Sequence, residues 1–129
     1  MPSPRQHSGT RAEDQALLLL QDKGFVLIGR HVSSRFGEID LLMCDRSTRA
    51  TIGHDTIVAV EVKARRSASH GTAIEAVTPA KYKKIADTLY TVCAERGLDA
   101  EHIRIDVVTF DPDGVRYLSG VGHAEGASE

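Results

Sequence analysis

GEIDLLMC (residues 37–44) and TIVAVEVK (residues 56–63) are the two stretches that decide the fold of this chain. Both are apolar over most of their length, and this pattern predicts strands over Arg35–Cys44 and Thr56–Lys63. The second stretch is almost entirely β-branched or small, which is typical of a central strand that is covered on both faces. Each stretch also has charged residues at alternate positions near one end. These are Glu38 and Asp40 in the first stretch, and Glu61 and Lys63 in the second.

The segments before these strands predict a helix and a further strand. Thr10 has the character of a helix N-cap, with Glu13 three residues later as in a capping box, and Gly24 ends the helical pattern. We therefore expect a helix over residues 11–23. A β-prone run from Phe25 to His31 follows it, and Ser33-Ser34 is the predicted hairpin turn into the next strand.

The segments after these strands predict a second helix and one or two strands. Asp45–Asp55 is polar and is expected to form a loop, whereas Thr78-Pro79 is typical of a helix start, and Gly97 is the expected end of that helix. His102–Phe110 predicts a fourth strand. A turn of the sequence Asp-Pro-Asp-Gly follows it, and Val115–Leu118 is then able to pair back as a short fifth strand.

This order of elements predicts an α/β fold. Three strands joined by short links favour an antiparallel meander, and the helical crossover from the third strand to the fourth favours a parallel step. The result is a mixed β-sheet flanked by helices, in the order α-β-β-β-α-β plus a short fifth strand. Residues 1–9 are expected to be a disordered arm, 10–118 the folded domain, and 119–129 a disordered acidic tail.

Length and composition exclude several classes of protein. The chain has 129 residues, which is typical of one domain, and its 41% hydrophobic and 26% charged content is ordinary for a globular protein. The longest apolar run, Ala16–Leu20, is far shorter than the roughly 20 residues of a membrane span. No apolar leader core is present in Met1–Gly9, so we expect the protein to be cytoplasmic. The two cysteines, Cys44 and Cys93, are expected to be buried thiols.

The charge of the chain is unevenly distributed. The formal net charge is only −2, which does not by itself suggest a nucleic-acid-binding protein. Between Glu61 and Lys84, however, six basic residues stand against two acidic ones. A local basic patch is able to hold a phosphate backbone even when the net charge is not basic. The candidate phosphate-binding residues in this region are Arg65, Arg66, Lys81 and Lys84.

The charged residues at alternate strand positions predict a catalytic metal site. Glu38 and Asp40 share one face of their strand, and Glu61 and Lys63 share one face of the next. Buried carboxylates that repel one another are costly unless a cation neutralises them, and oxygen ligands suit Mg²⁺ or Mn²⁺. Such a cation supports phosphodiester hydrolysis, and a nearby lysine is able to orient water or stabilise charge at phosphorus.

Structural explanations exist for each of these residues. Glu38 or Asp40 is able to form a plain cross-strand ion pair with Lys63, and Glu13 fits the capping box as well as a place in the site. Asp106 lies in an apolar strand and is either structural or a support for the site. The lysines at positions 81, 83 and 84 either form an ordinary solvated helix start or, in the case of Lys81, face a phosphate.

These residues, in this order, resemble the PD-(D/E)-x-K nuclease signature, with Asp40 as the first acid and Glu61-Val62-Lys63 as the E-x-K. More closely, the chain from about Thr10 to Phe110 resembles the YraN family of small bacterial proteins. The shared features are Glu13, the Gly24-Phe25 helix exit, the Gly-Glu-Ile-Asp-Leu and Val-Glu-Val-Lys strands, Arg65, Glu75-Ala76-Val77 with Lys81, and Arg104-Ile105-Asp106-Val107-Val108.

This resemblance implies a restriction-endonuclease-like fold, similar to that of Holliday-junction resolvases. It implies that Asp40, Glu61 and the backbone carbonyl of Val62 bind the metal, that Lys63 is catalytic, and that Glu13 and Glu38 line the site. The chain departs from the family pattern at two positions: asparagine is expected at His31 and glycine at Ala12. Neither departure is expected to touch the metal ligands.

Three functions remain open from the sequence. The first is a metal-dependent DNA endonuclease that acts on branched or recombination-type DNA, for which two symmetry-related sites in a homodimer are a natural arrangement. The second is a catalytically silent nucleic-acid- or protein-binding module on a nuclease fold, which the low aromatic content of 5% favours slightly. The third is a phosphodiesterase that acts on small substrates.

Overall fold

The computed structural model describes residues 4–65 and 77–121 of the chain. Its helices and strands follow the predicted order, with a short helical insertion after the second strand. Their bounds are α1 Pro4–Asp22, β1 Phe25–Ser34, β2 Gly37–Asp45, η1 Arg46–Thr48, α2 Arg49–Ile52, β3 Thr56–Ala64, α3 Pro79–Arg96, β4 Ile103–Asp111 and β5 Gly114–Leu118.

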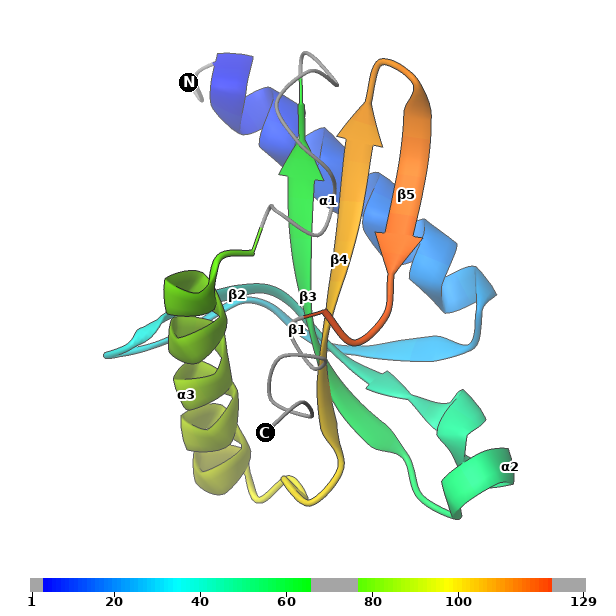
Figure 1. Cartoon of the computed structure of the whole chain (residues 1–129), viewed down its shortest axis with the longest axis vertical. Helices are drawn as coiled ribbons and strands as arrows, with labels where there is room; N and C mark the ends of the chain where they lie inside the picture. Colours follow the sequence, from blue (N-terminus) through cyan, green and yellow to red (C-terminus); the bar gives the residue numbers. More distant parts are fainter. Residues whose placement is uncertain (1–3, 66–76, 122–129) are drawn as a thin grey trace.

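The five strands form one mixed sheet in the order β1-β2-β3-β4-β5 (Figure 1). β1, β2 and β3 pair as an antiparallel meander, β3 and β4 are parallel, and β5 returns antiparallel to β4. The parallel step is made through α3, because a crossover helix is needed to return the chain to the same end of the sheet. The predicted mixed α/β fold is therefore confirmed.

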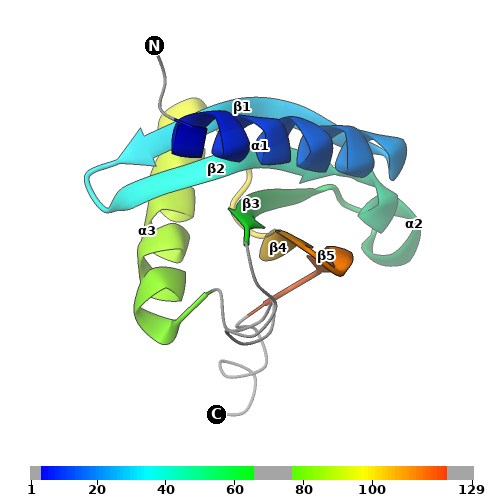
Figure 2. The same cartoon turned by 90° about the horizontal axis from the view of Figure 1, so that it is seen from above.

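The two long helices cover opposite faces of the sheet (Figures 1 and 2). On one face, Ala16 and Leu20 of α1 pack against a layer that includes Leu41, Val58 and Val60. On the other face, α3 packs through a second apolar layer that contains Ile85, Leu89, Val92, Leu42, Ala59 and Val107. β3 contributes alternate residues to both layers, which confirms that it is the central strand.

The ends of α3 follow the predicted rules. The Thr78 side chain accepts a hydrogen bond of 3.2 Å from the backbone N–H of Lys81, and Pro79 occupies the first turn. Gly97 adopts a left-handed φ of 68°, and its N–H donates to the carbonyl of Cys93. The bounds of α3, and with them the place of Lys81 in its first turn, therefore follow from the sequence.

Two boundaries in the first half of the chain differ from the sequence prediction. α1 begins at Pro4, so Thr10 lies within the helix and is not its cap, and residues 4–9 of the expected arm are helical. Proline fits the first turn of a helix, because the backbone N–H groups there have no partner within the helix and proline lacks this group. The hairpin turn lies at Arg35-Phe36, because the Ser34 hydroxyl accepts from the N–H of Phe36 and sits at the start of the turn.

The C-terminal end also differs from the expected tail. Val121 is buried, and its backbone N–H donates to the carbonyl of Ile105 over 2.8 Å. Residues 119–121 therefore continue the domain, and residues 122–129 lie outside the described part of the chain. In the described residues, no helix is long and apolar enough to cross a membrane.

Candidate metal centre

The centre lies at the point where β2 and β3 separate. Their antiparallel pairing ends at Leu41 and Val60, so Asp40 and Glu61 are the next residue on each strand. The Oδ2 atom of Asp40 accepts a hydrogen bond of 2.8 Å from the backbone N–H of Val62. This bond replaces the strand pairing that has just ended, and it holds the Asp40 carboxylate against β3.

A cavity of about 250 Å³ opens beside this fork between the sheet and the start of α3. Its lining includes the acidic residues Asp40 and Glu61 and the basic residues Lys63 and Lys81. The remaining walls are Val62, Val77, Ile85 and Val107. The alternation on β3 therefore brings Glu61 and Lys63 to one face, as the sequence predicted, and α3 adds Lys81 from the opposite wall.

The two carboxylates of the cavity are electrostatically unfavourable as anions. Burial, and after it the negative charge of the neighbouring Asp40, raise the pKa of Glu61 to about 8. Burial likewise raises the pKa of Asp40, against the lowering effect of its hydrogen bond from Val62. A pair of desolvated carboxylates that repel each other is the arrangement that a bound cation relieves.

One carboxylate oxygen of Glu61 is available as a ligand for such a cation. Its Oε2 atom is buried and has no hydrogen-bond partner among the residues that the structure describes. A buried carboxylate oxygen without a partner is costly, and a metal ion or ordered water is the usual remedy. The donor set of Asp40, Glu61 and the neighbouring backbone carbonyl of Val62 consists only of oxygen atoms, and this chemistry fits Mg²⁺ or Mn²⁺.

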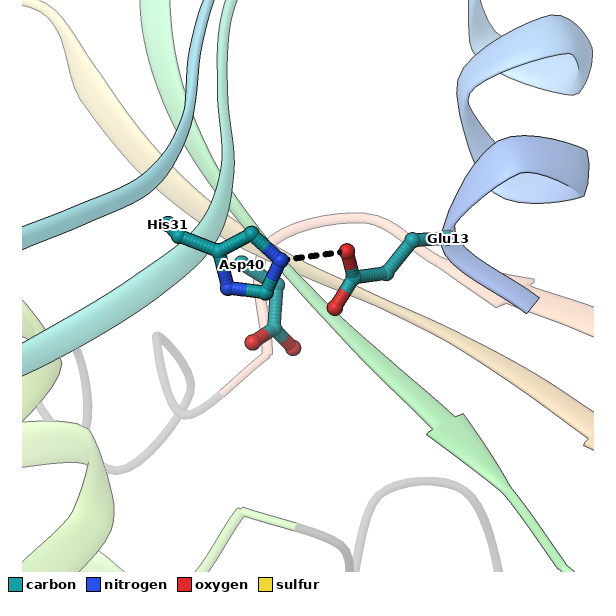
Figure 3. A group of neighbouring side chains, drawn as sticks. All are labelled: Glu13, His31 and Asp40. Carbon is teal, nitrogen blue, oxygen red and sulfur yellow. Dashed lines mark ion pairs between the residues drawn. The ribbon is translucent and has the colours of Figure 1, made fainter. Parts of the chain in front are cut away.

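A second group of side chains meets Asp40 on its other side (Figure 3). Glu13 from α1, His31 from β1 and Asp40 each offer one ligand atom, and these atoms lie within 4.8 Å of one another. His31 Nε2 lies 2.8 Å from Glu13 Oε1, and His31 Nδ1 lies 3.3 Å from Glu38 Oε1. Arg30 also contacts Glu13, with its Nη2 atom 3.2 Å from the same Oε1. Asp40 is therefore shared by the cavity and by this group.

Glu13 is brought to the site by the burial of one face of α1. Its side chain is only 10% exposed, and Ala16 and Leu20 on the same face of the helix are fully buried. The capping explanation for Glu13 is wrong, because Thr10 lies within the helix. Glu38 is more exposed, at 53% of its side chain, and reaches the group through its contact with His31.

The predicted basic residues lie in different places. Lys63 and Lys81 line the cavity, and Lys84 lies exposed one turn further along α3. Arg65 packs at the end of β4, where its Nε atom lies 3.6 Å from Asp111 Oδ1. Arg66 lies outside the described residues. Within the described ranges, Lys63 forms no ion pair with Glu38 or Asp40, so the simple ion-pair explanation is not supported.

Asp106 has a structural role on the other face of the sheet. It is fully buried and accepts hydrogen bonds from the side chains of Arg104 and Tyr117 and from the backbone N–H of Gly120. Arg104 also donates to Asp45 over 2.8 Å. This network ties the end of β2 and the segment after β5 to β4, and it does not reach the cavity.

His31 is the site residue that sequence reasoning missed. This position was expected to lie away from the proposed ligands, whereas its imidazole contacts Glu13 and has a ring nitrogen within 4.8 Å of a carboxylate oxygen of Asp40. His31 has a left-handed φ of 51°, which is rare for a residue other than glycine, asparagine or aspartate. The family pattern, which is expected to have asparagine here, could have indicated this backbone conformation, since asparagine tolerates a left-handed φ.

The sheet order, the helix on each face and the acidic fork between β2 and β3 together define an α/β protein with a restriction-endonuclease-like fold. The model of Uncharacterised protein family UPF0102 matches residues 12–110. The chain belongs to this family, which confirms its resemblance to the YraN family.

Relatives from several bacteria match most of the chain. It is 34% identical over 119 residues to a UPF0102 protein of Bordetella avium, which covers 92% of this chain and 77% of that one. A UPF0102 protein of Pasteurella multocida is 36% identical, with 85% of this chain and 87% of that one covered. A UPF0102 protein of Bordetella petrii is 40% identical, with 84% and 65% covered.

Proposed function

We propose that this protein is a metal-dependent endonuclease that hydrolyses phosphodiester bonds in DNA. The observation that carries this proposal is the cavity at the fork of β2 and β3, which contains the carboxylates of Asp40 and Glu61 and the ammonium groups of Lys63 and Lys81. Acidic groups for a cation and basic groups for a phosphate are both needed for this reaction, and they meet in one cavity.

Asp40, Glu61 and the backbone carbonyl of Val62 would hold one Mg²⁺ or Mn²⁺ ion. The ion supplies a Lewis acid that polarises the phosphoryl oxygen and lowers the pKa of a bound water. The unpartnered Oε2 atom of Glu61 supports this assignment, because a bound cation would satisfy it. The hydrogen bond from the Val62 N–H keeps Asp40 in place for the same purpose.

The lysines contribute the positive charge that a phosphate requires. Lys63 lies on the same face of β3 as Glu61, two residues later, so its ammonium group reaches the space in front of the carboxylates. There it is able to orient a water or stabilise negative charge at the phosphorus. Lys81 reaches the same space from α3 and is placed to contact a neighbouring phosphate of the backbone.

For the substrate, we propose branched or recombination-type DNA. A resolvase must cut two strands, and a chain of this size with one pair of carboxylates at the β2–β3 fork achieves this when two copies are related by symmetry. We therefore expect a homodimer in the presence of a four-way junction. Light scattering tests this directly, and a mass of 14.0 kDa without the junction, together with one chain per junction in the complex, would exclude the dimer.

The test of the activity is a cleavage assay on linear, single-stranded, flap and four-way-junction DNA with Mg²⁺ or Mn²⁺. Wild type is compared with Asp40→Asn and Lys63→Ala, and Asp113→Asn serves as the matched control because Asp113 lies exposed in the β4–β5 turn. All four proteins are purified identically, so that a contaminating nuclease gives the same signal in each.

We expect cleavage by wild type and by Asp113→Asn, and none by Asp40→Asn or Lys63→Ala. Equal cleavage by all four proteins would contradict the proposal. No cleavage with any metal, together with DNA binding that weakens steeply with salt, would favour the alternative of a catalytically silent nucleic-acid-binding module. Cleavage of a small chromogenic diester, but not of DNA, would favour the small-substrate phosphodiesterase.

A further inference from the structure

We propose that Glu13, His31 and Asp40 form a second divalent-metal site, and that its nitrogen ligand makes it selective for a transition metal such as Co²⁺ or Zn²⁺. The three residues come from α1, β1 and β2, and they point toward one another (Figure 3). This site would share Asp40 with the cation proposed above, and in this respect it rests on the proposed function. The second site does not require that the protein cleaves DNA.

The spacing of the donor atoms fits a metal ion. One atom from each of the three residues lies within 4.8 Å of the other two, so a cation between them needs only small side-chain movements to be within bonding distance. The contacts already described use Oε1 of Glu13 and Oδ2 of Asp40, so each carboxylate also has a second oxygen that is able to serve as a ligand.

Metal-binding histidines usually direct their second ring nitrogen to a carboxylate, which fixes the tautomer and the ring orientation. His31 has this arrangement. Its Nε2 atom faces Glu13, and its Nδ1 atom lies 3.3 Å from Oε1 of Glu38, which is outside the three proposed ligands. Glu38 therefore acts as the residue that positions the imidazole, which gives a role to the first acid of the Gly-Glu-Ile-Asp stretch.

The chemistry of the donors decides which metal is bound. The cavity beside Glu61 offers only oxygen atoms and suits a hard cation such as Mg²⁺. An imidazole nitrogen raises the preference for Zn²⁺, Co²⁺ and related ions, and a mixed set of one nitrogen and two carboxylates is typical of transition-metal sites. Asp40 would thus lie between a site for a hard cation and a site for a transition metal.

Cobalt titration of the full-length protein tests the second site, because Co²⁺ reports its own coordination through visible absorption. The decisive variant is His31→Asn, since asparagine tolerates the left-handed backbone at this position and removes the imidazole. The matched control is His54→Asn, because His54 is also an exposed histidine but stacks on His102, and neither residue belongs to the centre.

We expect wild type to bind Co²⁺ with a dissociation constant that rises at least about tenfold in His31→Asn and stays unchanged in His54→Asn. A paramagnetically shifted imidazole resonance is expected in the cobalt form of wild type and should be absent from His31→Asn. The affinity for Mg²⁺ should be the same in wild type and His31→Asn. Equal cobalt affinity in wild type and His31→Asn overturns the second site.

A further variant covers the case in which His31→Asn does not fold, as judged by thermal unfolding. Glu38→Gln leaves every proposed ligand in place and alters only the residue that positions the imidazole, so a raised dissociation constant for Co²⁺ supports the site and an unchanged one overturns it. The two proposals fail differently. Loss of the nuclease proposal leaves cobalt binding that depends on His31, whereas loss of the second site leaves cleavage that depends on Asp40 and Lys63.

Discussion

The carboxylate of Asp40 accepts a 2.8 Å hydrogen bond from the backbone N–H of Val62, at the place where the pairing of β2 and β3 has ended. Asp40 therefore has two separate functions in this protein. It satisfies a backbone donor that the sheet leaves unpaired, and it directs negative charge into a cavity beside Glu61. Substitutions that separate these two functions provide the first prediction.

Asp40→Asn and Asp40→Ala should have different effects on stability. Asparagine keeps an oxygen that accepts from Val62 and removes the repulsion with Glu61, so we expect unfolding free energy without metal to be unchanged or higher. Alanine leaves the Val62 N–H without its partner, and this should cost about 1–3 kcal/mol. Denaturant unfolding in a chelator measures both, and equal destabilisation by the two variants would contradict the role of the hydrogen bond.

The second prediction concerns the pH dependence of Mg²⁺ binding. Burial raises the pKa of Glu61 to about 8, and a cation requires the deprotonated carboxylate. Affinity should therefore rise up to about tenfold per pH unit below this pKa and level off above it. The titration is best made in the His31→Asn background, so that the imidazole does not contribute. Glu61→Gln should bind weakly, with little dependence on pH.

The second prediction extends to the stability of the metal-free protein, because the raised pKa of Glu61 makes the free energy of unfolding depend on pH. The folded-state pKa of Glu61 lies above its unfolded value of about 4.3, so folding favours the protonated carboxyl. This contribution to stability is full below about pH 4.3 and is lost as the pH rises toward about 8. Chelator-treated wild type should thus lose more stability over this range than Glu61→Gln, and saturating Mg²⁺ should reverse the loss. Parallel pH profiles for the two proteins would contradict this assignment.

The part of the centre that could be predicted from sequence follows from strand geometry. The alternation of side chains put Glu61 and Lys63 on one face of a central strand, and the short link between β2 and β3 implied antiparallel pairing. Together these rules place Asp40 beside Glu61, and the structure has them at this fork. The place of Lys81 in the first turn of α3 also followed from local rules, because Thr78-Pro79 defines the start of this helix.

The rest could not be predicted, because it depends on departures from regular geometry. The register of β1 shifts between Leu27 and Gly29, and His31 has a left-handed φ, so the two-residue alternation does not apply around this histidine. Glu13 fitted a cap as well as a place in the site, because a helix start was expected at Thr10, and only the true start at Pro4 removes the cap. Arg65 meets Asp111 only because parallel pairing brings the end of β3 beside the end of β4.

The third prediction separates structural acids from the metal centre. Asp106 is fully buried and paired with Arg104, so Asp106→Ala should lower the unfolding free energy by about 3–5 kcal/mol, as expected when one partner of a buried ion pair is removed. Its metal affinity, measured at a temperature where it is folded, should equal that of wild type. Asp55→Asn is the control, because the pair of Asp55 with Arg49 is largely exposed and should contribute little.

The fourth prediction concerns DNA binding and uses two lysines of the same helix. Lys81 lines the cavity beside the carboxylates, whereas Lys83 is 77% exposed and pairs with Asp87 four residues later. If Lys81 contacts a phosphate, Lys81→Ala should weaken binding of all DNA sequences and reduce the slope of log affinity against log salt by about 1. Fluorescence anisotropy with Ca²⁺ in place of Mg²⁺ measures this without requiring cleavage. Lys83→Ala should leave the slope unchanged, because Lys83 pairs with Asp87 and is not part of the cavity lining. Equal slopes for wild type and Lys81→Ala would place the DNA backbone elsewhere on the protein.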